Sequence, residues 1–426
     1  MAKWGVIADD LTGASDAGIT FATRGFQTSV YLSEEGSSRQ FTAEVAVADT
    51  DSRALKSTEA YQKVSRVAEE MKQAGVERIY KKVDSTLRGN LGAEIDAILD
   101  HMDYEFAFVA PAFPALGRTT KHGMHYVRQK PLHETEFARD PKNPMKSSSL
   151  TTILASQTRR KMGLLDQSIL DGSEEAITHF LLKMKEDQIA ILVCDAETDS
   201  DLLDLVRKVE PLGFRTLWVG SAGLTIPLAE SWNTGREAKK QPISFQPVDG
   251  PVMLVSGSLS PVTKQQLEVY TSRPSVRSVE IQPIALMREE SRQSELARCR
   301  EELEAALKSG RDVSLSVAPC QLNPVEDSTV LFAETISSAL GTVTAEVVEK
   351  VSVQGLILTG GDTAKAVCKS LGITELQLIQ ELETGIPLSR APEKDRLFVV
   401  TKAGGFGQES SLWNARNLLK GEMTDV

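Results

Sequence analysis

Short runs of strand-forming residues alternate with helix-periodic segments along almost the whole chain, and this alternation limits the fold more than any other feature. Strands separated by helices pair in parallel, because a helical crossover returns the chain to the same end of the sheet. The pattern predicts an α/β protein with two domains, each a mainly parallel sheet flanked by helices. The expected strands span 4–8, 45–49, 78–82, 106–110, 189–193 and 216–220, and then 252–256, 278–281, 313–317, 356–359 and 398–401.

The length of the chain also favours two domains, since 426 residues exceed what one ordinary core accommodates. Residues 233–250 are rich in Pro, Gly and polar side chains and follow neither the helical nor the strand period, which is typical of a linker. We therefore expect a first domain over 1–232, a linker over 233–250 and a second domain over 251–426.

A formal charge of −11 argues against a nucleic acid or an anionic membrane as partner, because either would need a basic face. No apolar run approaches the length of a membrane span, and the N-terminus lacks the features of a signal peptide. We expect a cytoplasmic protein without a membrane partner. The four cysteines stand far apart, which favours buried, reduced thiols over a zinc site or disulfides.

Two adjacent carboxylates, Asp9 and Asp10, follow the first expected strand. Open α/β sheets bind ligands at the carboxyl ends of their strands, so one aspartate could accept a proton from a hydroxyl while the other orients a substrate or cation. The alternative is that acidic turn residues cap the next helix, which explains one aspartate more easily than two. We place the cap of that helix at Ser15 or Asp16.

The segment KKVDSTLRGN at 81–90 gathers cations, a carboxylate and hydroxyls where another strand ends. Such a set suits a small hydroxylated anion, with cations for a carboxylate and polar groups for hydroxyls; the alternative is a solvated loop. The candidates in this segment are Lys82, Asp84, Ser85 and Arg88. Arg53, after a further strand, is a weaker candidate for the same pocket. His122 and His125 are interpreted as loop residues, since such a pair is poor evidence for a metal.

Three turns rich in Gly, Ser or Asp follow strands of the second domain. Glycine lets the backbone approach a ligand, and the N–H groups of such turns can bind phosphate. Neither a Walker A nor a Rossmann pattern is present. Asp362 is interpreted as an N-cap or as a ligand of hydrated magnesium. The candidate nucleotide-binding residues are Ser258, Gly360, Gly361, Asp362, Thr363, Gly404, Gly405, Phe406 and Gly407.

Six motifs in this order resemble those of the four-carbon acid sugar kinases, in particular the D-threonate and D-erythronate kinases. They are IADDLTGASDAG, YKKVDSTLRGNLGAEIDA, PAFPALGRTT, ETEFARDPKNP, LTGGDTAKAV and TKAGGFG. The resemblance implies a substrate domain followed by a nucleotide-binding domain, with ATP and Mg²⁺ as cofactors and the 4-phosphate of the acid as product. It places Asp9, Asp10, Arg53, Lys82, Asp84 and Ser85 at the acid sugar, and the glycine turns at ATP.

We expect Asp9 or Asp10 to position or deprotonate the attacking hydroxyl, and Lys82 and Arg53 to bind the substrate carboxylate. A 3-oxo-tetronate 4-kinase is the alternative within the family. A non-catalytic sensor of sugar acid and nucleotide, or a dehydrogenase, is an alternative outside it. A homodimer is the expected assembly, and metal ligands are not assigned.

Overall fold

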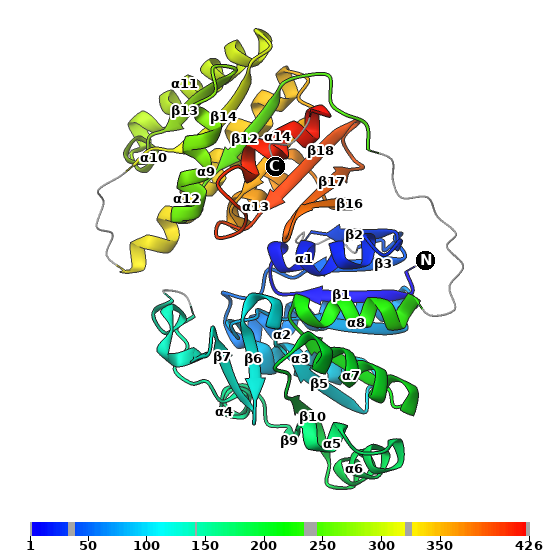
Figure 1. Cartoon of the computed structure of the whole chain (residues 1–426). Helices are drawn as coiled ribbons and strands as arrows, with labels where there is room; N and C mark the ends of the chain where they lie inside the picture. Colours follow the sequence, from blue (N-terminus) through cyan, green and yellow to red (C-terminus); the bar gives the residue numbers. More distant parts are fainter. Residues whose placement is uncertain (1, 33–38, 141–142, 234–244, 320–325, 423–426) are drawn as a thin grey trace. The chain divides into compact units, whose positions relative to one another are not determined.

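The computed structural model describes residues 2–32, 39–140, 143–233, 245–319 and 326–422, of which 326–330 as backbone only. It divides into two compact units, Met1–Lys240 and Gln241–Val426. Within each unit, helices lie against a sheet (Figure 1). Most of the predicted linker, residues 234–244, lies outside the described residues.

The first unit is built on a parallel sheet with the strand order β2-β3-β1-β4-β11-β5-β10-β9. Six of its strands were predicted, five of them to the residue, whereas β2 and β9 were not. The strands are β1 (Trp4–Ala8), β2 (Thr28–Tyr31), β3 (Val45–Asp49), β4 (Arg78–Lys82), β5 (Phe106–Ala110), β9 (Lys161–Leu165), β10 (Ile189–Cys194) and β11 (Thr216–Gly220).

Helices cover both faces of this sheet. α2 and α3 pack together over a core that includes Ile7, Ile79 and Val219. On the other face α1 and α8 meet through Phe21 and Trp232, whose rings stack 5.3 Å apart. The helices of the unit are α1 (Leu11–Ala22), α2 (Ser57–Gln73), α3 (Leu91–His101), α4 (Leu150–Ala155), α5 (Gln167–Leu170), α6 (Glu174–Glu186), α7 (Asp199–Val209) and α8 (Ala222–Asn233).

A small antiparallel sheet, which the sequence did not predict, follows β5. It consists of β6 (Arg118–Lys121), β7 (Met124–Val127) and β8 (Lys130–Pro131). His122 lies in the tight turn between β6 and β7, as a loop residue should. The assignment of His125 to a loop was wrong, because this residue is a fully buried member of β7.

The second unit has the strand order β13-β14-β12-β15-β18-β17-β16, parallel from β13 to β18 and antiparallel beyond. The strands β16 and β17 were not predicted. The strands are β12 (Val252–Ser256), β13 (Val276–Ile281), β14 (Asp312–Val317), β15 (Gly355–Thr359), β16 (Glu375–Glu383), β17 (Ile386–Ala391) and β18 (Leu397–Lys402), and the helices are α9 (Pro261–Thr271), α10 (Pro283–Met287), α11 (Glu289–Lys308), α12 (Glu326–Lys350), α13 (Gly361–Leu371) and α14 (Ser411–Lys420).

One helix corrects the statement that no apolar run reaches the length of a membrane span. Leu331–Lys350 of α12 is long and apolar enough to pass that test by length and composition. Its apolar character has another explanation, because Leu340, Val343 and Val347 are fully buried and the helix packs against α11 and α13. A core helix of this kind satisfies the same criterion.

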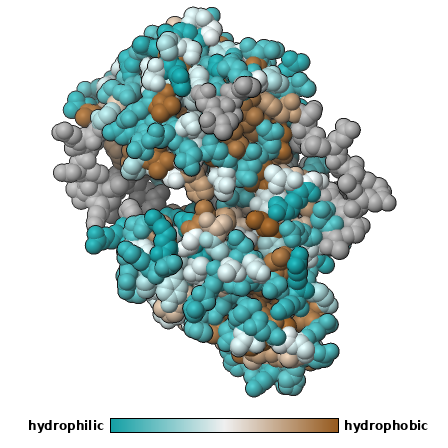
Figure 2. All heavy atoms as spheres, in the orientation of Figure 1, coloured by the Kyte–Doolittle hydropathy of each residue, from teal (hydrophilic) through white to brown (hydrophobic). Residues whose placement is uncertain are grey.

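Apolar residues lie mainly inside the units. The visible face mixes hydrophilic residues with scattered hydrophobic ones (Figure 2). Cys194, Cys299 and Cys368 are buried, free thiols, as predicted, and burial raises the pKa of both Cys299 and Cys368 to about 12. The fourth cysteine, Cys320, lies outside the described residues.

Candidate functional site

Three neighbouring strands of the first unit bring the predicted site residues together. β1 lies between β3 and β4, and Ala8 at its end is level with Asp49 and Lys82 at theirs. The chain that leaves each strand therefore starts from the same edge of the sheet. Asp9 and Asp10 follow β1, Arg53 follows β3, and Asp84 follows β4.

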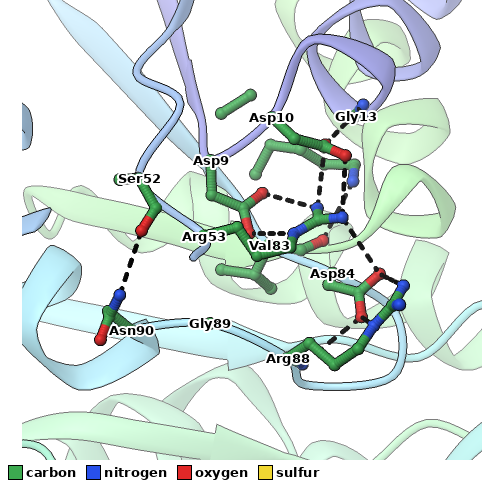
Figure 3. Close-up of polar contacts among 12 residues, drawn as sticks. Asp9, Asp10, Gly13, Ser52, Arg53, Val83, Asp84, Arg88, Gly89 and Asn90 are labelled. Carbon is green, nitrogen blue, oxygen red and sulfur yellow. Dashed lines mark hydrogen bonds and ion pairs between the residues drawn. The ribbon is translucent and has the colours of Figure 1, made fainter. Parts of the chain in front are cut away.

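Arg53 joins the two aspartates (Figure 3). Its Nε and Nη2 donate to the two carboxylate oxygens of Asp9 at 2.7 and 2.9 Å. Its Nη1 and Nη2 donate to the two oxygens of Asp10 at 2.8 and 2.9 Å. A guanidinium carries five N–H donors, so one remains, and Asp84 Oδ1 lies 3.9 Å from Nη1. The Arg53 side chain is therefore largely occupied by protein carboxylates.

The two aspartates differ in exposure and in acidity. The Asp9 side chain is 3% exposed and the Asp10 side chain 29%. Burial opposes ionisation of Asp9, but Arg53, Lys81 and Lys82 outweigh it and lower the pKa of Asp9. Burial, together with the adjacent charge of Asp9, raises the pKa of Asp10. Asp10 is thus the more accessible and the more basic carboxylate.

Asp10 also corrects the predicted start of the first helix. α1 begins at Leu11, and Asp10 is its N-cap, with a carboxylate oxygen that accepts from the Gly13 N–H at 2.8 Å. Ser15 and Asp16 lie inside the helix rather than at its cap. The alternative that the aspartates cap the next helix is therefore correct for Asp10. Asp9 caps no helix among the described residues.

Lys82 brings an ammonium group to the same place. It is 4% exposed, and its Nζ makes one hydrogen bond to a described residue, with the Val83 carbonyl at 3.0 Å. A Cβ on Gly13 would stand 3.0 Å from this Nζ and 2.6 Å from Asp10 Oδ1, so the glycine is needed for the close approach. Two of the three ammonium protons remain for a ligand.

The loop after β4 is held by Asp84 and Arg88. Arg88 Nε and Nη2 donate to Asp84 at 2.7 and 3.2 Å, and Nη1 donates to Asp140 at 3.1 Å. The charges of Arg53 and Arg88, with hydrogen bonds from Arg88 and Thr86, hold the pKa of Asp84 well below its usual range despite burial. The Arg88 guanidinium also lies over the Phe137 ring. Arg88 therefore connects two loops and uses three of its five N–H donors for this.

Ser85 presents its hydroxyl group without a described partner. Its carbonyl is bonded to His125 Nε2 at 2.8 Å, and His125 Nδ1 contacts Thr120 Oγ1 at 3.0 Å. Burial lowers the pKa of His125 to about 4, so the ring is neutral near pH 7. The histidine fixes the turn that carries Ser85.

A buried ion pair that the sequence analysis missed supports this edge of the sheet. Lys81 Nζ lies 2.7 Å from Glu94 Oε2, and Ser52 Oγ donates to Glu94 Oε1 at 2.6 Å. Asn90 Nδ2 donates to the Ser52 carbonyl at 3.1 Å and so fixes the segment that carries Arg53 (Figure 3). Glu94 lies in an otherwise helix-periodic stretch, where no local signal marks it.

The glycine turns of the second unit also converge. A Cβ on Gly404 would stand 2.3 Å from Ser258 Oγ, and one on Gly360 would stand 3.5 Å from the Ser258 N–H nitrogen. Gly360 has a φ of 99° and is the N-cap of α13, so the prediction of Asp362 as N-cap was wrong. Asp362 lies in the first turn of α13, and Thr363 is buried beneath it.

In the AGGFG loop, some glycines pack against protein atoms and one does not. Gly407, with a φ of 83°, has room for no Cβ beside Ser411, and Phe406 packs against Gly385. Gly405 is different, because a Cβ there would meet nothing within 4 Å. The N–H groups of Gly404 and Gly405 make no hydrogen bond to described residues. Open N–H groups at a glycine turn suit an anion.

Within the described residues, no group of three or more His, Cys, Asp or Glu side chains is arranged to hold a metal ion.

Comparison with known proteins matches both units. Residues 4–228 match the model of a sugar-binding N-terminal domain, and residues 253–412 match that of a nucleotide-binding C-terminal domain. The chain is 34% identical to a D-threonate kinase of Salmonella typhimurium, with 96% of both chains covered. It is 31% identical to a D-erythronate kinase of Heliobacterium modesticaldum over 90% of this chain and 88% of that one.

Two further comparisons also cover nearly the whole chain. A 3-oxo-tetronate kinase of Burkholderia multivorans is 27% identical over 95% of this chain and 94% of its own. Among solved structures, a protein of Salmonella typhimurium LT2 superposes with a TM-score of 0.81 at 25% identity, covering 97% of this chain and 99% of that chain.

Proposed function

The chain belongs to the four-carbon acid sugar kinase family, and on that premise we propose that it transfers the γ-phosphoryl group of ATP to the 4-hydroxyl of D-threonate or D-erythronate. The observation that carries the proposal is the pairing of a buried ammonium, Lys82, with an accessible carboxylate of raised pKa, Asp10, at one edge of the sheet. A hydroxy acid needs a cation for its carboxylate and a base for its hydroxyl.

Asp10 is proposed as the base that accepts the proton of the 4-hydroxyl. Its accessible side chain can reach a ligand, whereas Asp9 is buried and bonded to Arg53. A raised pKa makes a carboxylate a better proton acceptor, provided that the pH stays above it. Arg53 keeps the pair charged and in place.

The substrate carboxylate is assigned to Lys82, and Arg118 replaces Arg53 as its partner in this proposal. Arg53 already binds two carboxylates. Arg118 donates Nη1 to the Leu116 carbonyl, but its buried Nε has no partner among the described residues. Burial lowers the pKa of Arg118, opposed by the negative charge of Asp84. The Ser85 hydroxyl is a candidate for a substrate hydroxyl.

The nucleotide phosphates are assigned to the turns at Ser258, Gly360–Thr363 and Gly404–Gly407. Magnesium would neutralise charge on the phosphates, and Asp362, exposed in the first turn of α13, is a carboxylate that would hold it. Direct in-line transfer requires the hydroxyl to reach the γ-phosphate, so domain closure is part of the proposed mechanism.

Within the family, the D-threonate and D-erythronate kinases match at higher identity than the 3-oxo-tetronate kinase, and this supports the hydroxy acid as substrate. The two domain models that match are those of a sugar-binding and a nucleotide-binding domain, and they do not favour a dehydrogenase. A sensor would bind both ligands without turnover. We also propose that the protein is cytoplasmic and forms a homodimer.

An ATP-consumption assay over a panel of acceptors tests the function. D-Threonate, D-erythronate and 3-oxo-tetronate would be compared with the uncharged tetritols, and phosphorus NMR would locate the new ester. We expect turnover with one or both hydroxy acids, a 4-phosphate product and no turnover of the tetritols. Preferred turnover of the 3-oxo acid would move the chain to the other branch. Binding without ATP consumption would identify a sensor.

A further inference from the structure

A buried polar layer lies behind the AGGFG loop and was not part of the predicted site. Lys402, the last residue of β18, is 3% exposed. Its Nζ donates to the carbonyls of Ala403 at 2.8 Å, Phe406 at 3.1 Å and Gly404 at 3.3 Å. Thr263 Oγ1 of α9 lies 3.4 Å from the same Nζ. The ammonium thus collects the carbonyl oxygens of the loop.

Gln266 of α9 extends this layer. The residue is fully buried, and its Nε2 donates to the carbonyls of Phe406 at 3.0 Å and Gln408 at 2.7 Å. Thr263 adds a hydrogen bond from its hydroxyl to the Gly404 carbonyl at 2.8 Å. Three side chains from one strand and one helix therefore bind the same face of the loop.

The direction of the carbonyls fixes the direction of the N–H groups. In a planar trans peptide, the C=O of one residue and the N–H of the next point to opposite sides. The carbonyls of Ala403, Gly404 and Phe406 point toward Lys402. The N–H groups of Gly404, Gly405 and Gly407 consequently point away from it, and those of Gly404 and Gly405 have no described partner.

We propose that Lys402 and Gln266 are positioning residues that hold the loop carbonyls from behind and so present the loop N–H groups to the nucleotide phosphates. The inference rests on the nucleotide site of the proposed function and adds to it. A direct contact between Lys402 and phosphate fits the geometry less well, because four protein oxygens already surround its Nζ. An ammonium has only three protons to donate.

The lysine should also make nucleotide binding depend on pH. Burial lowers the pKa of Lys402 to about 8, opposed by the negative charge of Glu383 on β16. The side chains of α9 that face it, Thr263 and Gln266, are uncharged. Below this pKa the charged amine donates three protons. Above it, the neutral amine has two protons and a lone pair that faces carbonyl oxygens, so the loop should loosen as the pH rises.

ADP calorimetry on the intact chain from about pH 7 to about pH 9.5 tests the inference. We expect the wild-type affinity to fall about tenfold across this range. Lys402→Met should bind ADP about tenfold more weakly near pH 7 and show no further loss at higher pH. Lys420→Met is the matched control, because Lys420 Nζ donates to the Gly250 carbonyl elsewhere in the unit. It should behave as wild type.

Gln266→Met separates loop positioning from a charge effect. It should weaken ADP binding and keep the wild-type dependence on pH, since the lysine remains. A flat wild-type profile, or wild-type affinity in either Gln266→Met or folded Lys402→Met, would overturn the inference. Because no sugar acid is used, the result is independent of the proposed kinase activity. A protein that binds ADP in this way but phosphorylates none of the acids would contradict only the proposed function.

Discussion

Arg53 determines how two adjacent carboxylates share one strand end. Like charges so close together disfavour ionisation of one of them, and burial adds to this. Arg53 bridges both groups with four hydrogen bonds. Asp9 keeps a lowered pKa, and Asp10 acquires a raised one. Arg53, Lys81 and Lys82 thus lower the pKa of Asp9, while burial and the charge of Asp9 raise that of Asp10.

Asp10→Asn tests the assignment of the base. Asparagine caps helices about as well as aspartate, so α1 should keep its N-cap. The variant loses the proton acceptor, and we expect turnover to fall by roughly 10²- to 10⁴-fold while ADP affinity stays unchanged. The control is Asp166→Asn, which replaces the aspartate that caps α5. Near-normal turnover in Asp10→Asn would assign the proton to another group.

The pH profile of the wild type gives a second measurement of the same residue. Asp10 accepts a proton only as a carboxylate, so activity should fall as the pH drops through its pKa. Because that pKa is raised, the acid limb should lie above the usual aspartate range near 3.9. A limb at or below that range would contradict the role of Asp10.

Replacing Lys82 should weaken substrate binding, whereas replacing Arg53 should lower the stability of the protein. Lys82→Met removes a charged hydrogen bond to the substrate carboxylate, so KM for the acid should rise about 10- to 100-fold with KM for ATP unchanged. Arg53→Met leaves Asp9 and Asp10 without their counter-ion, and we expect the free energy of unfolding to drop by about 3–5 kcal/mol. Steady-state kinetics and urea denaturation distinguish them. An equal drop in the free energy of unfolding in both variants would contradict these separate roles.

At the scale of elements, the packing of the glycine turns requires glycine at some positions and leaves room for a side chain at one. Gly404 and Gly407 face protein atoms at contact distance, whereas Gly405 faces open space. Gly405→Val should therefore fold normally and lose ADP binding by at least about tenfold, because its branched side chain would occupy phosphate space. Gly250→Ala, at another glycine with room for a Cβ, is the control. Unchanged ADP affinity in Gly405→Val would show that the turn is only structural.

Most of the strands that sequence reasoning recovered carry apolar runs. β1, β3, β5, β11 and β12 were predicted to the residue, because buried parallel strands carry such runs. β4 was also predicted to the residue, although its sequence RIYKK is largely charged. β9 was missed since Gly163 interrupts it; a Cβ there would approach Leu192 Cδ2 at 3.1 Å. β16 contains charged and polar residues at the antiparallel edge, so its period did not stand out.

The clustering of the candidate site residues was predictable from their positions in the sequence. Asp9 and Asp10 follow β1, Arg53 follows β3 and Lys82 ends β4, and adjacent strand ends meet in space. What the sequence could not reveal is which cation pairs with which carboxylate. The sharing of Arg53 between two aspartates, and the roles of Glu94 and Lys402, depend on packing between distant segments.

For the whole molecule, the existence of two compact units has a thermodynamic consequence. Each unit contains its own core, so we expect two transitions in scanning calorimetry. ADP at about 100 times its Kd should stabilise one unit by about 2.7 kcal/mol and raise that transition by about 5–10 °C. Gly405→Val should reduce the shift by about half or more and so assign it to the second unit. An equal ADP shift of both transitions would contradict independent units.

The alkylation rates of the buried thiols report how often each unit opens. Cys194 lies in β10 of the first unit, and Cys299 and Cys368 lie in α11 and α13 of the second. Burial raises the pKa of all three thiols, so alkylating reagents find neither an accessible sulfur nor a thiolate in the folded state. Each thiol becomes reactive only when its own unit opens. Pulsed alkylation followed by peptide mass analysis can therefore time the opening of the two halves of one unmodified chain.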